Sequence, residues 1–135
     1  MKLKISQIED EEEARELHEL SFPGDSFPGA HHTYWVARDE QKKLAGFASA
    51  LITDYGACFL SRAAVAAQYQ GRGLHKRLIR HRLRWAKRQG ASYACTYTVA
   101  KNYPSILNLL GCGFRFYEPD EFWAGQSMHY LRKDL

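Results

Sequence analysis

A glycine-rich turn followed by a strongly basic segment is the part of this sequence whose residue types point most directly to chemistry. Gly71 and Gly73 come just before a predicted helix. The unpaired backbone N–H groups at a helix start, together with its partial positive charge, can bind a phosphate, and glycine lets the main chain close around it. A tight strand-to-helix turn would use the same glycines, so alone they favour both interpretations about equally.

The segment from Gly73 to Gln89 predicts an amphipathic helix with one cationic side. At about 100° per residue, its apolar side chains share one half of the helical wheel. The cations late in the helix are typical of a solvated face near the negative helix end. Arg82 falls in the apolar half, for which the pattern offers no reason. Three cations stand in or just before the first turn, beside the predicted phosphate site: Arg72, Lys76 and Arg77.

Two motifs resemble those of the GNAT superfamily of N-acetyltransferases. The first, Gln70 to His75 (QGRGLH), starts five residues after an apolar run and resembles the acetyl-CoA pyrophosphate motif Q/R-x-x-G-x-G/A. The second, Asn102 to Phe114, resembles the superfamily's later helix, which opens on Asn, carries a small residue three positions on and closes on Gly-Phe. The resemblance covers residues 44–131 and implies an acetyl-CoA-dependent N-acetyltransferase that acts on an amine of a small molecule or protein.

The resemblance implies a site for acetyl-CoA, as co-substrate, between two splayed parallel strands. The pantetheine arm lies along the first strand, and a backbone N–H near Val65 polarises the thioester carbonyl. The amine attacks directly and the CoA thiolate leaves, with no metal implied. The implied cofactor-binding residues are Ala63, Ala64, Val65, Gln70, Gly71, Arg72, Gly73, Leu74, His75, Lys76, Arg77 and Asn102.

The residues that many family members use as acid and base are missing here. Leu109 stands where many members have a tyrosine acid, and residues 55–117 contain no glutamate to act as base. Asn102 and Ser105, three apart on one helical face, are the catalytic candidates that remain, because they could hold a water or donate a weak hydrogen bond. Looser candidates for proton transfer are Tyr97, Tyr103, Tyr117 and His129.

His75 is a second departure, since the motif expects glycine or alanine at that position. Its side chain either shifts the cofactor or, turned outward, adds a phosphate contact. A register that starts at Gln68 would put Gly73 at the small-residue position. The register from Gln70 is favoured, because Gly73 then sits at the helix entry and the distance from Val65 matches the family.

The order of elements predicts a single α/β domain over residues 1–135, with a central mixed, mostly antiparallel sheet, a parallel central strand pair and flanking helices, as in the GNAT fold. A β-forming run on each side of the basic helix makes a βαβ unit, whose strands should lie parallel. Strands are expected at 3–8, 33–37, 44–52, 58–65, 93–99, 114–117 and 126–132, the last two as an antiparallel pair, and helices at 10–20, 73–89 and from 102.

Charge is strongly segregated along the chain, although the net charge is only +4. Residues 1–54 carry 6 basic and 11 acidic side chains. Residues 55–117 carry 11 basic side chains and no acidic one, and residues 118–135 carry 2 basic and 4 acidic side chains. The basic block suits a polyanionic ligand, and both coenzyme A and a nucleic-acid backbone are of that kind.

The three cysteines, Cys58, Cys95 and Cys112, are far apart in the sequence. Their odd number and spacing argue against a disulfide framework and against a zinc site. They are expected as core thiols in a reducing compartment, with a catalytic Cys58 or Cys112 left open.

No apolar run is long enough for a signal peptide or a membrane span, so a cytoplasmic location is expected. A homodimer is left open.

The loop at 21–29, with two Phe-Pro-Gly units, corresponds by resemblance to a region that walls the acceptor pocket. The candidate acceptor contacts in and beside this loop are Phe22, Phe27, His31 and His32. In the alternative interpretation, the two phenylalanines fix the loop to the core and the two histidines are solvated.

Two other functions compete with the transferase. One is an acyl-CoA-binding protein of the same fold with little activity. The other is a nucleic-acid-binding module on the Arg80–Arg88 face, disfavoured because Trp85 lies on the apolar side.

Overall fold

One seven-stranded sheet organises the chain. The computed structural model describes residues 2–29 and 31–135, apart from the side chain of Glu11. The strand order is β1-β2-β3-β4-β5-β7-β6, and every neighbouring pair is antiparallel except the parallel pair β4 and β5. This confirms the predicted mixed, mostly antiparallel sheet. The strands are β1 (Lys4–Ile8), β2 (Thr33–Arg38), β3 (Leu44–Ile52), β4 (Ala57–Val65), β5 (Tyr93–Val99), β6 (Arg115–Phe116) and β7 (Met128–Asp134).

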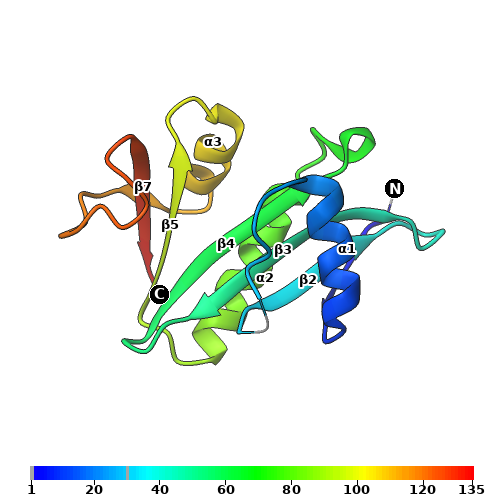
Figure 1. Cartoon of the computed structure of the whole chain (residues 1–135), viewed down its shortest axis with the longest axis horizontal. Coiled ribbons are helices and arrows are strands. Elements are labelled where there is room, and N and C mark those ends of the chain that lie inside the picture. The colour runs from blue at the N-terminus through cyan, green and yellow to red at the C-terminus, as the bar shows by residue number, and fades with distance from the viewer. Residues whose placement is uncertain (1, 30) are drawn as a thin grey trace.

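The helices cover both faces of the sheet, as Figure 1 shows with α1 in front and α2 behind. They are α1 (Glu11–Ser21), α2 (Leu74–Arg88) and α3 (Tyr103–Gly111), with a short 3₁₀ turn η1 (Ala67–Tyr69) ahead of α2. The apolar half of α2 packs on the sheet, where Leu78 and Ile79 are fully buried. On the opposite face, Leu17 of α1 packs against Val36 and Phe47. None of the described helices is long and apolar enough to cross a membrane.

The last two strands pair as predicted, but their place in the sheet was not foreseen. β6 and β7 are antiparallel over two residue pairs. β7 also pairs with β5 over seven residue pairs, from Tyr93 with Asp134 to Val99 with Met128. The final strand therefore lies between β5 and β6. This position buries its apolar residues Tyr130 and Leu131.

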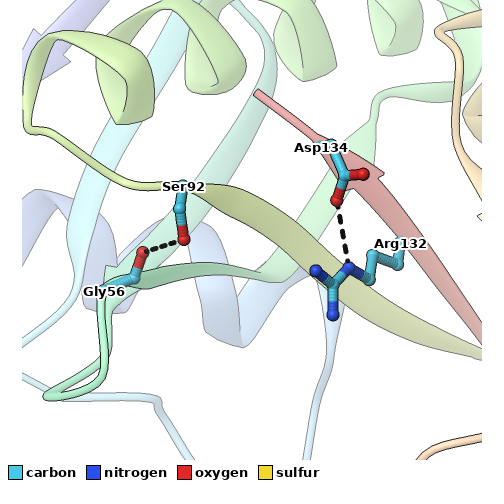
Figure 2. Close-up of polar contacts among 4 residues, drawn as sticks. All are labelled: Gly56, Ser92, Arg132 and Asp134. Carbon is cyan, nitrogen blue, oxygen red and sulfur yellow. Dashed lines mark hydrogen bonds and ion pairs between the residues drawn. The ribbon is translucent and has the colours of Figure 1, made fainter.

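β4 and β5 are joined at one end only. Their ladder begins at Ala57 with Tyr93 and stops at Phe59 with Cys95, and Figure 1 shows the two strands diverging beyond it. Figure 2 shows the closed end, where Ser92 Oγ lies 3.5 Å from the Gly56 carbonyl. At the other end of the ladder, Thr96 Oγ1 donates to the Leu60 carbonyl at 2.8 Å, which is the last link before the strands part.

A bulge in β4 starts where the ladder with β5 ends. Ala48 of β3 pairs with Ala63 and Ala50 pairs with Leu60, so Ser61 and Arg62 of β4 face the single residue Ser49. A bulge of this kind bends its strand and increases its twist. The bend turns the second half of β4 away from β5.

The backbone of β4 after the bulge is held close to Gly46 of β3. A Cβ at Gly46 would lie 2.7 Å from the Ala64 carbonyl oxygen and 3.3 Å from a Leu74 methyl group. Relieving this contact would require the β4 backbone at Ala64 and the Leu74 side chain of α2 to move, which would disturb the core. Glycine is therefore required at this position for the observed approach of β3, β4 and α2.

We expect Gly46→Ala to destabilise the fold by about 1–3 kcal/mol, because overpacking a closed core forces the backbone to shift. Urea unfolding followed by circular dichroism measures this, with Gln7→Ala at an exposed position of β1 as the control. Equal midpoints for Gly46→Ala and the wild type would show that this close approach is not required.

Candidate functional site

A cavity of about 780 Å³ opens where β4 and β5 separate. Its walls come from the second half of β4, the turn before α2, the end of β5 and the start of α3. No carboxylate lines it among the described residues. Of the residues that the sequence predicts for the site, it is lined by Ala63, Ala64, Val65, Gln70, Gly71, Gly73, Leu74, His75, Asn102 and Ser105.

The second half of β4 turns backbone amides into this cavity. Arg62 N donates to Ser49 Oγ at 3.0 Å, and Ala66 N donates to a β3 carbonyl at 2.8 Å. Amide directions alternate along a strand. The N–H groups of Ala63 and Val65 therefore face away from β3, toward the gap left by β5, where a bound molecule can pair with them.

The glycine turn leaves open space in front of the start of α2. Gly71 and Gly73 have φ of 77° and 78°, and a Cβ at either position would meet nothing within 4 Å. Gly73 is the N-cap of α2, and its carbonyl accepts the first helical bond from Arg77 N at 3.1 Å. The N–H groups of the first turn ahead of Arg77 have no partner within the helix. Gln70 Nε2 donates to the Val65 carbonyl at 3.1 Å and ties the turn to β4.

The three early cations lie outside the cavity lining. Arg77 Nη2 donates to the Leu3 carbonyl at 2.8 Å, at the start of the chain. The Lys76 ammonium lies against Gly111 of α3, and Arg72 is exposed on the turn. The positive character of the cavity mouth therefore comes first from backbone amides, with these side chains around it.

His75 is half-buried and engaged with α3. Asn108 Nδ2 lies 2.9 Å from His75 Nδ1, so the imidazole accepts at Nδ1 and carries its proton on Nε2, a tautomer assigned from this partner. Burial first, and the nearby Arg82 guanidinium second, lower the pKa of His75 to about 4. The ring is thus neutral near pH 7 and adds no positive charge to the turn.

Asn102 and Ser105 lie together at the start of α3, on the cavity wall. Asn102 is the N-cap, and its Oδ1 accepts from Ser105 N at 3.4 Å. The Asn102 amide group and the Ser105 hydroxyl keep further donors available for a water or a ligand. Leu109 is buried, with 4% of its surface exposed, in the core beside α2.

Tyr97 is the one looser proton-transfer candidate on the cavity wall among the described residues. Its ring stacks on Phe59 at 6.0 Å and meets Trp123 edge-on at 5.2 Å. The lining excludes the other three, Tyr103, Tyr117 and His129. Tyr97, Phe59 and Trp123 pack together as an aromatic cluster, of which Tyr97 alone belongs to the described cavity lining.

A polar chain at the β4 bulge was not anticipated as a unit. His32 Nδ1 lies 2.8 Å from Ser61 Oγ, and Ser61 Oγ lies 2.6 Å from Ser49 Oγ. Ser49 Oγ also accepts from Arg62 N, which joins the chain to the β4 backbone. With the His32 proton on Nε2, a tautomer choice, Ser61 donates to His32 and Ser49 donates to Ser61. Burial, then neighbouring His31, lowers the pKa of His32. The sequence singled out His32 only as an acceptor contact. A polar Ser-Arg pair inside an apolar strand was the one available signal for the bulge.

The other predicted acceptor contacts have different surroundings. Phe22 lines the cavity, and the Arg62 guanidinium lies 4.8 Å above its ring. Phe27 stacks on Tyr34 at 5.3 Å, as a pin for the loop. His31 is exposed. Arg62 also pairs with Asp25 at 3.6 Å, so the loop after α1 is attached to the bulge.

The cysteines are free and buried. Burial raises the pKa of the Cys58 thiol to about 12 and also raises that of Cys95. A protonated, enclosed Cys58 has no nucleophilic thiolate at neutral pH. No cluster of three or more histidine, cysteine or acidic side chains with metal-binding geometry occurs in the described part of the chain.

Comparisons with known proteins agree with this geometry. The fold matches an IAA acetyltransferase from Bacillus cereus with a TM-score of 0.83 and 22% identity, over 99% of this chain and 100% of that one. It matches a Bacillus subtilis acetyltransferase in complex with CoA with a TM-score of 0.81 and 24% identity, over 99% of each chain. It also matches a GNAT family acetyltransferase from Elizabethkingia anophelis with acetyl-CoA bound, with a TM-score of 0.77 and 16% identity, over 98% of each chain.

At these identities the structural likeness shows the fold alone. A search of curated protein sequences found no significant match. The sequence model of the Acetyltransferase (GNAT) family matches residues 3–114. With that match over most of its length, the chain belongs to the GNAT acetyltransferase family.

Proposed function

We propose that this protein is an acetyl-CoA-dependent N-acetyltransferase that moves the acetyl group to an amine of a small molecule or protein by direct attack. The observation that carries the proposal is the cavity between β4 and β5, whose mouth is the glycine turn at the start of α2. The CoA and acetyl-CoA complexes among proteins of the same fold support it.

In this proposal the main chain holds the co-substrate. The diphosphate lies against the N–H groups at the start of α2, in the open space before Gly71 and Gly73. The pantetheine arm pairs with the cavity-facing groups of Ala63 and Val65. The Val65 N–H then stabilises the negative charge that develops on the thioester oxygen during attack.

Proton transfer falls to groups other than carboxylates, since none lines the cavity among the described residues. The Ser61 hydroxyl accepts the proton of the attacking amine and passes its own proton to the neutral His32 ring. At the other side of the reacting carbonyl, Asn102 and Ser105 hold a water that donates a hydrogen bond to the sulfur, so that CoA leaves as the thiolate. A CoA thiol is a fair leaving group, so positioning and charge stabilisation supply much of the rate.

The buried Leu109 and the lack of a lining carboxylate favour a second candidate, an acyl-CoA-binding protein of this fold with little transferase activity. Calorimetric titration with acetyl-CoA gives binding under both functions. Thiol release on addition of a panel of amines separates them, because only the transferase turns over. Absence of acetyl-CoA binding would exclude both.

Gly73→Val should weaken acetyl-CoA binding by about tenfold or more, equivalent to about 1.4 kcal/mol, because its side chain enters the space before the helix start. Arg88→Ala, on the solvated face, should change binding by less than about twofold. Calorimetric titration measures both. Gly90→Val is the matched control, since Gly90 has φ of 87° at the far end of the same helix and also has open space around its Cβ position. Equal losses at Gly73 and Gly90 would place the phosphates elsewhere.

His32→Gln should lower kcat by roughly 100-fold, the usual contribution of a general base. With a weakly basic amine acceptor, wild-type kcat/KM should be level at neutral pH and fall in acid as His32 is protonated. Because the pKa of His32 lies below its ordinary value of 6.5, the fall should lie below that pH. The variant should lose this limb of the profile, whereas His31→Gln keeps it. An unchanged pH profile in His32→Gln would remove His32 from the proton path.

A further inference from the structure

A buried arginine lies at the inner end of the cavity. Arg82 projects from the sheet-facing side of α2 and has only 2% of its surface exposed, yet it lines the cavity together with Leu60 and Thr96. Leu60 and Thr96 mark the point where β4 and β5 part. The guanidinium therefore stands where the cavity ends between the two strands.

The hydrogen bonds of Arg82 leave part of the guanidinium unused. Nε donates to the Leu78 carbonyl and Nη1 donates to the Ser49 carbonyl, each at 3.2 Å. Nη2 has no hydrogen-bond partner among the described residues. The bond to Ser49 has a structural reason, because the β4 bulge leaves Ser49 facing two residues and frees its carbonyl from the regular ladder.

The positive charge of Arg82 has no counter-ion in the described part of the chain. Residues 55–117 contain no acidic side chain, and the described ion pairs of arginine belong to Arg38, Arg62 and Arg132. Burial lowers the pKa of Arg82 to about 10, so the group stays charged at neutral pH. Burying an ion without a partner is costly, and an apolar side chain would suit this half of α2 better.

We propose that Arg82 binds a carboxylate of the substrate at the inner end of the cavity and so selects substrates that carry one. A planar guanidinium matches a carboxylate with paired N–H donors, and the match is strong where water is excluded. The carboxylate comes either from the acyl group of the donor, as in a dicarboxylic acyl-CoA, or from an amino-acid-like acceptor. The inference rests on the proposed function, of which it names the substrate class.

Two pairs of substrates distinguish the sources. The donor pair is succinyl-CoA against butyryl-CoA with one common amine, and the acceptor pair is an α-amino acid against its decarboxylated amine with acetyl-CoA. Thiol release measures kcat/KM for each. We expect the carboxylate-bearing member of one pair to be favoured by about 10- to 100-fold, as for a hydrogen-bonded charged group.

Arg82→Met should collapse that ratio to within about twofold, and Arg82→Lys should keep part of it. Arg80→Met, at an exposed position of the same helix, should leave the ratio as in the wild type. A structural role alone would lower both members of a pair equally, so an unchanged ratio in Arg82→Met overturns the proposal. If Arg82→Met does not fold, a wild-type ratio near one in both pairs overturns it instead.

Failure of the proposed function has a separate signature, namely no thiol release with any donor and amine. In that case both pairs are compared by calorimetric titration of the wild type and Arg82→Met, the acceptor pair in the presence of CoA. Tighter binding of the carboxylate-bearing member of one pair that is lost in the variant supports the carboxylate site. Equal binding within both pairs by the wild type overturns it.

Discussion

The early end of the parallel ladder between β4 and β5 is the constraint on which the rest of this structure depends. Pairing stops after Phe59 and Cys95, and the bulge at Ser61 and Arg62 then bends β4 away from β5. A continuous ladder would satisfy every backbone group and leave no room for a ligand. Here the gap becomes a cavity, and amides that a neighbouring strand would otherwise occupy face into it.

The polar groups around the cavity are arranged so that neutral and main-chain groups dominate its surface. The pKa of His75 and that of His32 are both lowered by burial, so neither ring is a cation near neutral pH. Arg77, a cation in the first turn of α2, donates its hydrogen bond to the Leu3 carbonyl outside the cavity lining. Two arginines are the exceptions on the wall: Arg62, which pairs with Asp25, and Arg82, which has no ion pair in the described part of the chain and brings a full charge to the innermost wall.

Much of the fold could be predicted from the sequence, and the site only in part. The glycine turn, the Asn102 cap and the second half of β4 lie together on the cavity wall. The roles predicted for them stay predictions. The partnership of His32 with Ser61 and the place of Arg82 were missed, because each depends on a residue far away in the chain: 29 positions for His32 and Ser61, and 33 for Arg82 and Ser49.

The sequence by itself determined the helices, the strands, the parallel βαβ unit and the turn that precedes α2, because hydrophobic periodicity and glycine conformation are local properties. The family resemblance also implied that the two parallel strands splay apart. Only the tertiary structure decided that their ladder ends at Phe59 and Cys95, that β7 lies between β5 and β6 and that Arg82 reaches the cavity. These outcomes depend on strand pairing and side-chain packing between distant segments. The two residues of such a contact are too far apart in the sequence for a local pattern to include both.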